Sequence, residues 1–301
     1  MIFKLRNRTA HTLATHNATR LAVLELPPLY YTQPRAVVQI IHGAMEYKER
    51  YLPLATYLQE SGYAVVLSDN RGHGHSVSAD DPFGLMKSVD QLVADQVQIT
   101  NWIKEHYPQS EVVIYGHSMG SLIARLYLQR HDHLLSKLIM TGTPNYNVLA
   151  PLGMRLIRLV QRVKKDDEVS NLVARVCGNQ INGYSWLSYN QDNIARVRQD
   201  PMMIKRYPLG SMKTLVEADL RLKDPAQWQC RQPHLPILNL VGADDHQITG
   251  GKKGIADTVA RLKQSGYHNI QTILMPHMKH EVLFEKDHRK VYQAMNKFLA
   301  E

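Results

Sequence analysis

The amino-acid sequence predicts an α/β fold, with a mostly parallel β-sheet, helices on both faces and an inserted cap. Short runs of apolar and β-branched residues alternate with helical patterns, which is typical of a parallel sheet buried on both sides. The alternation stops near residue 144 and resumes near residue 232. The chain has 301 residues, 44% hydrophobic and 21% charged, which is enough for one large core with an inserted piece.

The expected elements follow one another along the chain. Two early strands are expected at residues 3–7 and 18–26, as an antiparallel start. The later strands are expected at residues 36–43, 62–74, 111–115, 135–144, 236–245 and 270–281. Helices are expected at residues 47–61, 89–108, 121–128 and 289–301, where apolar side chains recur at helical spacing.

The segment that interrupts this pattern is expected to form a cap over the strand ends. We place the core at residues 1–143 and 232–301, and the cap at residues 144–231. Residues 147–165 have the spacing of an amphipathic helix, with apolar residues on one side and basic residues on the other. The apolar side is Leu149, Leu152, Leu156, Leu159, Val160 and Val163, and the basic side is Arg155, Arg158, Arg162 and Lys165. The apolar side fits either packing on the main domain or an apolar lip that dips into a lipid surface.

Charge and composition limit the partners and the compartment. The net charge is +9, and residues 145–231 hold 14 Lys/Arg against 8 Asp/Glu, a balance of +6. No nucleic-acid-binding motif accompanies this charge, so we expect no nucleic-acid partner. The sequence has neither a signal-peptide pattern nor a run of about 18 uncharged apolar residues. Its only two cysteines, Cys177 and Cys230, fit structural thiols in a reducing compartment, so we expect a cytoplasmic protein.

Residues 112–128, with the sequence VVIYGHSMGSLIARLYL, contain the motif that points to chemistry. Gly116, Ser118 and Gly120 form the pattern G-x-S-x-G between a strand pattern and a helix pattern. Small neighbours let the backbone turn sharply and lift one hydroxyl clear, as in a nucleophile elbow. The pattern alone is common, so it is the strand-to-helix context that favours Ser118 as a nucleophile over an ordinary glycine-rich turn.

A serine nucleophile needs a histidine base and a carboxylate that orients the histidine. In folds with such an elbow, the acid and then the histidine follow the serine, on loops after late strands. Asp244 and Asp245 follow one late strand, and two of the 15 histidines, His277 and His280, follow the last one. Spacing alone does not choose between the two aspartates or between the two histidines.

Two backbone amides are expected to stabilise the oxyanion that forms during attack. One is the amide of Met119, the residue directly after the serine. The second is the amide of Ala44, which follows a strand and the pair His42–Gly43.

Two other stretches suggest ligand sites but lack the required spacing. In DNRGHGHS, His73 and His75 are two apart, but the next residues, 77–79, are not the further Asp and His that a di-metal hydrolase site needs. TGGKKG, which starts at Thr249, lacks the spacing of a phosphate-binding loop. We therefore expect neither a metal nor a cofactor.

Over nearly its whole length, the chain resembles the monoacylglycerol lipase and lysophospholipase-like branch of the α/β hydrolases, also grouped as serine aminopeptidase-like. HGAMEYKERY resembles the family's HGxxEHxxRY, DNRGHGHS its DxRGHGxS, VGADD its GxxD and KHEVLFE its HExxxE, and GHSMGS forms the elbow. GYSWLSYN resembles the WLSxD stretch of a bacterial subgroup. Tyr47 and Asn190 depart from these patterns, which commonly have histidine and aspartate there.

The resemblance implies the α/β-hydrolase fold and a role for each candidate. Ser118 is the nucleophile, Asp245 the acid and His280 the base, and the amides of Ala44 and Met119 bind the oxyanion. Asp244 and His277 become alternates.

The resemblance also implies a reaction. It implies hydrolysis of a lipid-like carboxylic ester, a monoacylglycerol or a lysophospholipid, through an acyl-enzyme and without a cofactor. Short-chain carboxylesterase or aminopeptidase-like activity on the same fold are the alternatives, and a non-catalytic binding module is least favoured because all three triad members are available. The basic cap suggests peripheral contact with an anionic membrane surface.

Overall fold

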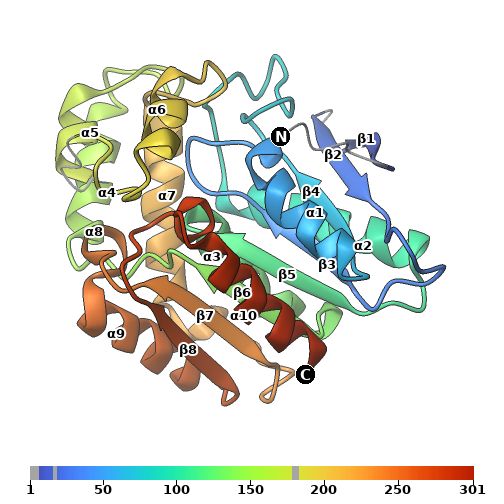
Figure 1. Cartoon of the computed structure of the whole chain (residues 1–301). Coiled ribbons are helices and arrows are strands. Elements are labelled where there is room, and N and C mark those ends of the chain that lie inside the picture. Colours follow the sequence, from blue (N-terminus) through green and yellow to red (C-terminus); the bar gives the residue numbers. More distant parts are fainter. Residues whose placement is uncertain (1–6, 16–18, 178–182) are drawn as a thin grey trace.

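The computed structural model describes residues 7–15, 19–177 and 183–301, and in these ranges an eight-stranded sheet forms the centre of the molecule (Figure 1). The strand order is β1-β2-β4-β3-β5-β6-β7-β8. Strands β3 to β8 run parallel, whereas β2 pairs antiparallel with both β1 and β4. The strands are β1 Thr9–Ala14, β2 Arg20–Leu26, β3 Val37–Ile41, β4 Ala64–Ser68, β5 Val112–His117, β6 Lys137–Thr141, β7 Ile237–Gly242 and β8 Ile270–Met275. The expected mostly parallel α/β sheet is confirmed.

The start of the sheet differs from the expectation. The strand expected at residues 3–7 lies outside the described residues, except for Asn7, which is in a bend. At the edge of the sheet, β2 pairs antiparallel with β1, a strand of exposed and half-buried residues that was not expected from the sequence. Such an edge strand carries few large apolar side chains, so the sequence pattern missed it.

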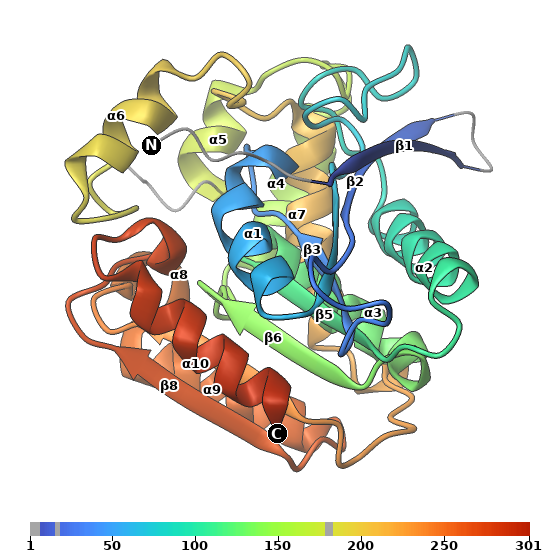
Figure 2. The ribbon, with the colours of Figure 1, turned by 45° about the vertical axis from the view of Figure 1, so that its right-hand side comes forward.

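Helices cover both faces of the sheet (Figure 2). Helices α1 and α10 pack on one face, and α2, α3 and α9 pack on the other. Side chains of β3 alternate between these two apolar layers, with Val38 and Ile40 in one and Val37 and Ile41 in the other. The helices of this part are α1 Leu52–Glu60, α2 Val89–His106, α3 Met119–His131, α8 His246–Thr249, α9 Gly251–Gln264 and α10 His288–Ala300. Short 3-10 turns lie at Lys48–Tyr51, Asp132–Leu134, Pro225–Gln227 and Val282–Phe284.

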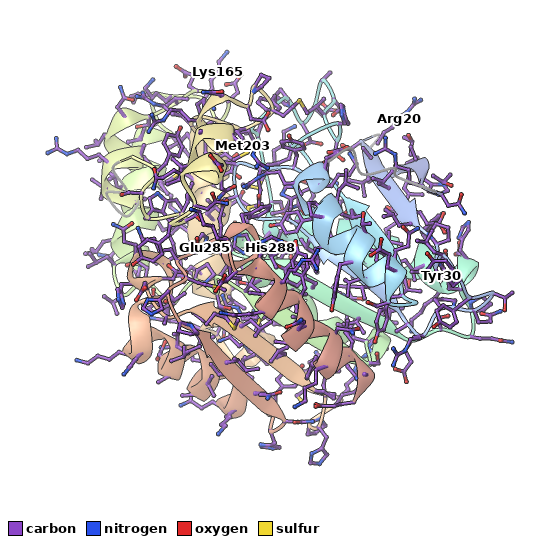
Figure 3. The ribbon with its side chains drawn as sticks, in the orientation of Figure 1. Arg20, Tyr30, Lys165, Met203, Glu285 and His288 are labelled. Carbon is purple, nitrogen blue, oxygen red and sulfur yellow. The ribbon has the colours of Figure 1, made fainter. Side chains whose placement is uncertain are left out.

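The helices between β6 and β7 gather at one side of the molecule (Figure 1). They are α4 Ala150–Val160, α5 Asn171–Cys177, α6 Gln191–Gln199 and α7 Leu209–Leu222. Helix α7 packs against both α4 and α3, so it connects this group to the sheet. Figure 3 marks this side with Lys165 and Met203, and the opposite side with Arg20 and Tyr30.

The most buried residues of helix α4 lie outside the apolar stripe that was named from the sequence. The expected helix ends at Val160, and its most buried residues are Ala150, Gly153, Met154 and Ile157. Small residues allow close packing here, since a Cβ on Gly153 would lie 3.1 Å from Sγ of Cys177 in α5. Of the six apolar residues named from the sequence, Leu156 and Val160 pack on the neighbouring cluster. Four others, Leu149, Leu152, Leu159 and Val163, are 58 to 84% exposed. Of the two uses that the sequence left open for this stripe, packing on the main domain therefore applies only to Leu156 and Val160.

No helix in the described ranges is long and apolar enough to cross a membrane.

Candidate active site

The turn between β5 and α3 lifts the hydroxyl of Ser118 above the end of the sheet. Ser118 has φ 51°, a left-handed conformation that side chains rarely adopt, and its amide donates to the carbonyl of Thr141 at 2.9 Å. The two glycines of the motif allow close backbone approach. A Cβ on Gly116 would lie 2.5 Å from the carbonyl oxygen of Gly120, and one on Gly120 would clash with the carbonyl oxygen of Ile41. A larger residue at Gly116 would push β5 and α3 apart, and one at Gly120 would push α3 away from the end of β3.

Three of the residues named from the sequence meet at this turn. His280 Nε2 lies 2.9 Å from Ser118 Oγ, and His280 Nδ1 lies 2.8 Å from Asp245 Oδ2. A carboxylate can only accept, so Nδ1 carries the proton and Nε2 is free to accept the serine proton. His280 and Asp245 are both about 2% exposed, whereas Ser118 is half-buried. The arrangement can move a proton from the serine to the histidine while the carboxylate fixes the ring.

The two alternates lie outside this constellation. Asp244 accepts a hydrogen bond from the hydroxyl of Tyr189 at 3.1 Å, and His277 is an exposed turn residue. Asp245 is distinguished from its neighbour because it also caps α8, where its Oδ1 accepts from the amide of Ile248. This cap turns the side chain of Asp245 inward, toward His280.

The amides of Ala44 and Met119 are both available to a ligand. Over the ranges that the structure describes, neither amide donates to a protein acceptor. The amides on either side of Ala44 are occupied, because Gly43 donates to Glu46 at 2.6 Å and Met45 donates to the hydroxyl of Tyr207 at 2.7 Å. Two unoccupied backbone donors beside a serine–histidine pair are what an oxyanion needs.

Two further rings contact His280. The ring of His117 lies 4.8 Å from that of His280, and the ring of Trp186, from the segment before α6, lies 5.0 Å from it. His117 is fully buried and hydrogen-bonds to Thr141. Burial and the neighbouring His280 lower the pKa of His117 to about 3. His117 is therefore neutral and places no second positive charge beside His280 when the latter takes up a proton.

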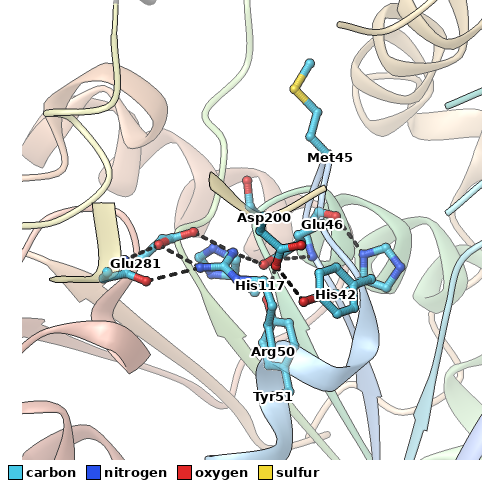
Figure 4. Close-up of polar contacts among 12 residues, drawn as sticks. His42, Met45, Glu46, Arg50, Tyr51, His117, Asp200 and Glu281 are labelled. Carbon is cyan, nitrogen blue, oxygen red and sulfur yellow. Dashed lines mark hydrogen bonds and ion pairs between the residues drawn. The ribbon is translucent and has the colours of Figure 1, made fainter. Parts of the chain in front are cut away.

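A buried ion network joins three segments around the site (Figure 4). Arg50 donates to both carboxylate oxygens of Glu281, at 2.8 and 3.1 Å, and also to Glu46 and to Asn193 of α6. Glu46 in turn holds the Gly43 amide, and Glu281 directly follows His280. Burial opposes the charge of Arg50, but Glu281 and Glu46 keep its pKa above the ordinary value. Glu46 and Arg50 lie in one sequence motif and Glu281 in another, and nothing in either motif indicates that they pair.

Tyr47 and Asn190, the two residues that differ from the family motifs, lie where the segment between β6 and β7 meets the core. Tyr47 donates to Asp200 at 2.6 Å, and Asn190 caps α6 and donates to the carbonyl of Phe284 at 2.8 Å. Glu285, labelled in Figure 3, accepts from the hydroxyl of Ser188 at 2.8 Å. The serine of the WLSxD-like stretch and the last glutamate of HExxxE therefore form one contact.

No group of three or more His, Cys, Asp or Glu side chains in the described part of the chain is arranged to hold a metal ion.

The sheet, the elbow and the loops after β7 and β8 define an α/β hydrolase. This chain belongs to the family described as serine aminopeptidase S33, which matches residues 32–287. The family resemblance drawn from the motifs is confirmed.

Two relatives agree with this assignment. The chain is 40% identical to phospholipase YtpA of Bacillus subtilis over 272 residues, covering 88% of this chain and 95% of that protein. It is 26% identical over 290 residues to a probable lysophospholipase L2 of Haemophilus influenzae, covering 92% of this chain and 88% of the relative.

Two crystal structures share the fold. A thermostable carboxyl esterase from Bacillus coagulans, in complex with glycerol, has a TM-score of 0.86 at 24% identity over 97% of this chain and 98% of the esterase. A soluble variant of monoglyceride lipase from Saccharomyces cerevisiae, with a substrate analogue, has a TM-score of 0.78 at 17% identity over 99% of this chain and 97% of the lipase.

Proposed function

We propose that this chain is a serine hydrolase that cleaves a carboxylic ester of a monoacylglycerol or a lysophospholipid through an acyl-enzyme on Ser118. The observation that carries the proposal is the hydrogen-bonded chain from Ser118 through His280 to Asp245, at 2.9 and 2.8 Å, beside two unoccupied amides. The names of the relatives, among them lysophospholipase, phospholipase and monoacylglycerol lipase, support a lipid ester as substrate.

In the first half of the reaction, His280 removes the proton of Ser118 while Oγ attacks the ester carbonyl carbon. The carbonyl oxygen becomes an oxyanion, which the amides of Ala44 and Met119 stabilise. Asp245 holds the ring and stabilises its positive charge. When the tetrahedral intermediate collapses, His280 gives its proton to the leaving alcohol, and the acyl group stays on Ser118.

In the second half, His280 removes a proton from a water molecule that attacks the acyl-enzyme. The same two amides stabilise the second oxyanion, and collapse releases the fatty acid and returns the proton to Ser118. Each step uses only residues of this chain and water.

We also propose that residues 144–231 act as a cap that covers the acyl chain and contacts a lipid surface. Exposed large apolar residues gather on α4, on α5 and beside them. Monomeric soluble proteins rarely expose large apolar patches unless the patch binds something. The exposed apolar residues are Val148, Leu149, Leu152, Leu159, Val163, Leu172 and Val176. The basic residues of the same segment, among them Arg155, Arg158 and Arg162, favour anionic lipids.

The substrate is tested by fatty-acid release from a monoacylglycerol and a lysophosphatidylcholine with the same acyl chain, with Ser118→Ala as the blank. Faster release from the glycerol ester defines a monoacylglycerol lipase, and faster release from the phospholipid defines a lysophospholipase. Release no faster than the blank from both lipids contradicts the proposal and directs attention to short esters.

Vesicle co-sedimentation at low salt tests the lipid surface. Tighter binding to anionic than to neutral vesicles is expected. Equal binding to both contradicts the role of the basic residues.

A further inference from the structure

The loop that carries Ala44 contains a backbone conformation that needs outside support. Met45 follows Ala44 directly and has φ 63°, in the left-handed region that disfavours side chains. Such residues persist when the surrounding structure over-determines them, and they cluster at active sites. The contacts that hold Met45 therefore bear on the position of the neighbouring amide.

Both backbone polar groups of Met45 are held from the segment between α6 and α7. The Met45 amide donates to the hydroxyl of Tyr207 at 2.7 Å, and the Met45 carbonyl accepts from the amide of Ile204 at 2.9 Å. On the other side of Ala44, the Gly43 amide donates to Glu46, shown in Figure 4 with Met45. The residues on both sides of Ala44 are thus fixed, which leaves its own amide pointing in one direction.

The hydroxyl of Tyr207 is itself oriented by a second buried residue. It lies 2.6 Å from Nε2 of His73, and Nδ1 of His73 lies 3.0 Å from the carbonyl of Arg71. A carbonyl can only accept, so His73 carries its proton on Nδ1, and Nε2 accepts from Tyr207. Burial, with a contribution from His42, lowers the pKa of His73 to about 3, which keeps Nε2 an acceptor.

The hydrogen bonds therefore run in one direction, from the Met45 amide to Tyr207 Oη, from the Tyr207 hydroxyl to His73, and from His73 to Arg71. Tyr207 and His73 are 3% and 0% exposed, so water does not compete for these bonds. The same hydroxyl lies 3.8 Å from Sδ of Met119, the residue that carries the other oxyanion amide.

We propose that Tyr207 is a positioning residue of the oxyanion hole: its hydroxyl, oriented by His73, fixes Met45 and thereby aims the Ala44 amide at the oxyanion. The inference rests on the proposed function, because it requires Ala44 to donate during ester cleavage. It also gives a role to the DNRGHGHS stretch, in which His73 holds a tyrosine instead of a metal. A residue from between α6 and α7 then takes part in organising the catalytic loop.

Tyr207→Phe tests the proposal because it removes one oxygen atom and keeps the ring. Loss of an oxyanion donor costs about 10²- to 10³-fold in kcat, and a misaimed donor should cost less, about 10- to 100-fold. KM should change by less than about threefold, because the contact strengthens only in the transition state. Affinity for an alkyl boronic acid, whose serine adduct places a tetrahedral oxygen in the hole, should fall by a factor similar to that for kcat.

Tyr127→Phe is the matched control. Tyr127 is also fully buried, and its hydroxyl donates to Thr100 at 3.0 Å, among the core residues under α2 and α3. Its loss removes one buried tyrosine hydrogen bond away from Ser118, so kcat should stay within about twofold of wild type. Titration with a fluorophosphonate counts the molecules whose Ser118 is reactive, so that each kcat is calculated per active molecule.

Three results would overturn the inference: an unchanged kcat in Tyr207→Phe, a change in KM alone with boronic-acid affinity intact, or an equal loss in Tyr127→Phe. Should Tyr207→Phe fail to fold, His73→Phe removes the acceptor that orients the hydroxyl. The kcat of His73→Phe should also be lower than that of the wild type, and an unchanged kcat would overturn the inference. Ser118→Ala is measured alongside. Activity that survives in Ser118→Ala contradicts the proposed function, whereas an inactive Ser118→Ala with a fast Tyr207→Phe contradicts this inference alone.

Discussion

The segment between β6 and β7 has an inner side, which contacts the catalytic loops, and an outer side, which faces solvent. The two sides differ in the interactions that they make. On the inner side, Tyr207, Asn193 and Ser188 make hydrogen bonds to the loops after β3 and β8. On the outer side, Leu152 and Leu159 are each 58% exposed. Directional polar contacts fix the inner side relative to the catalytic loops, whereas the outer side offers only apolar area and charge. Changes on the inner side should therefore alter stability and catalysis, and changes on the outer side should alter only what the protein binds.

The largest effect on stability is expected from Arg50→Met, which breaks the network between the inner side and the site. It leaves Glu46 and Glu281 buried without their shared cation, and removal of one partner of a buried ion pair costs about 3–5 kcal/mol. Urea unfolding measures the loss. The control is Arg221→Met, because Arg221 pairs at the surface with the exposed Asp90 and the partly exposed Glu217 and its loss should cost less than about 1 kcal/mol. Equal losses of unfolding free energy in the two variants would show that the buried network contributes no more to stability than a surface ion pair.

A smaller effect is expected from Glu285→Gln, which weakens the anchor of residues 188–190. Glu285 accepts from the Ser188 hydroxyl at 2.8 Å and from the Tyr189 amide at 3.0 Å. Hydrogen bonds to a charged group contribute about 1.5–3 kcal/mol each, so amide exchange in this stretch should accelerate by about 10- to 100-fold. Hydrogen-exchange mass spectrometry measures it. Glu217→Gln, in a partly exposed ion pair on α7, should leave exchange at residues 188–190 unchanged. Unchanged protection of these residues in Glu285→Gln would contradict the anchoring role of Glu285.

The buried histidine beside the site predicts a loss of stability in mild acid. The pKa of His117 is about 3 in the folded chain and 6.5 ordinarily, so below pH 6.5 the unfolded chain binds a proton that the folded chain refuses. The free energy of unfolding therefore falls as the pH drops from 7 to 5, by up to about 2 kcal/mol for this group. His117→Asn should remove most of this contribution in urea unfolding at the two pH values. An identical pH dependence in the variant and the wild type would contradict a neutral His117.

The smallest effect on folding is expected on the outer side. Replacing both Leu152 and Leu159 with serine should change the free energy of unfolding by less than about 0.5 kcal/mol for each substitution, because both side chains are exposed. Binding to anionic vesicles should weaken at least tenfold, since burying one leucine in lipid contributes about 1.5–3 kcal/mol. Hydrolysis of a short soluble ester should be unchanged. Leu274→Ser, an exposed leucine on β8, is the control, and equal vesicle binding by the double variant and the wild type would contradict the lipid contact.

The sequence predicted the elements that are buried on both faces, because apolar runs such as β3 and β7, each with a single polar residue, leave few alternatives. It missed β1, whose residues are half-exposed. It left two uses open for the apolar stripe of α4, and that stripe does not include Ala150 and Gly153, which are buried in the helix contacts but carry a weak hydrophobic signal because they are small. Spacing found both aspartates and both histidines, and the family motifs then favoured Asp245 and His280.

The contacts of the inner side lay beyond sequence reasoning for a physical reason. Tyr207 is 162 residues from Met45 and 134 from His73, and only the folded chain brings the three together. Arg50 and Glu281 are separated by 231 residues. No local pattern marks such pairs, although each of Arg50, His73 and Glu281 lies within a motif that resembles the family's.

The most direct test of Ser118 as the nucleophile is covalent labelling with an alkyl fluorophosphonate, followed by peptide mapping and an assay of lipid-ester hydrolysis. The proposed mechanism predicts one label per chain, located on the peptide that contains Ser118, with activity lost in proportion to labelling and no labelling of Ser118→Ala. A label on another residue, or full hydrolysis of the lipid ester after Ser118 is completely labelled, would contradict it.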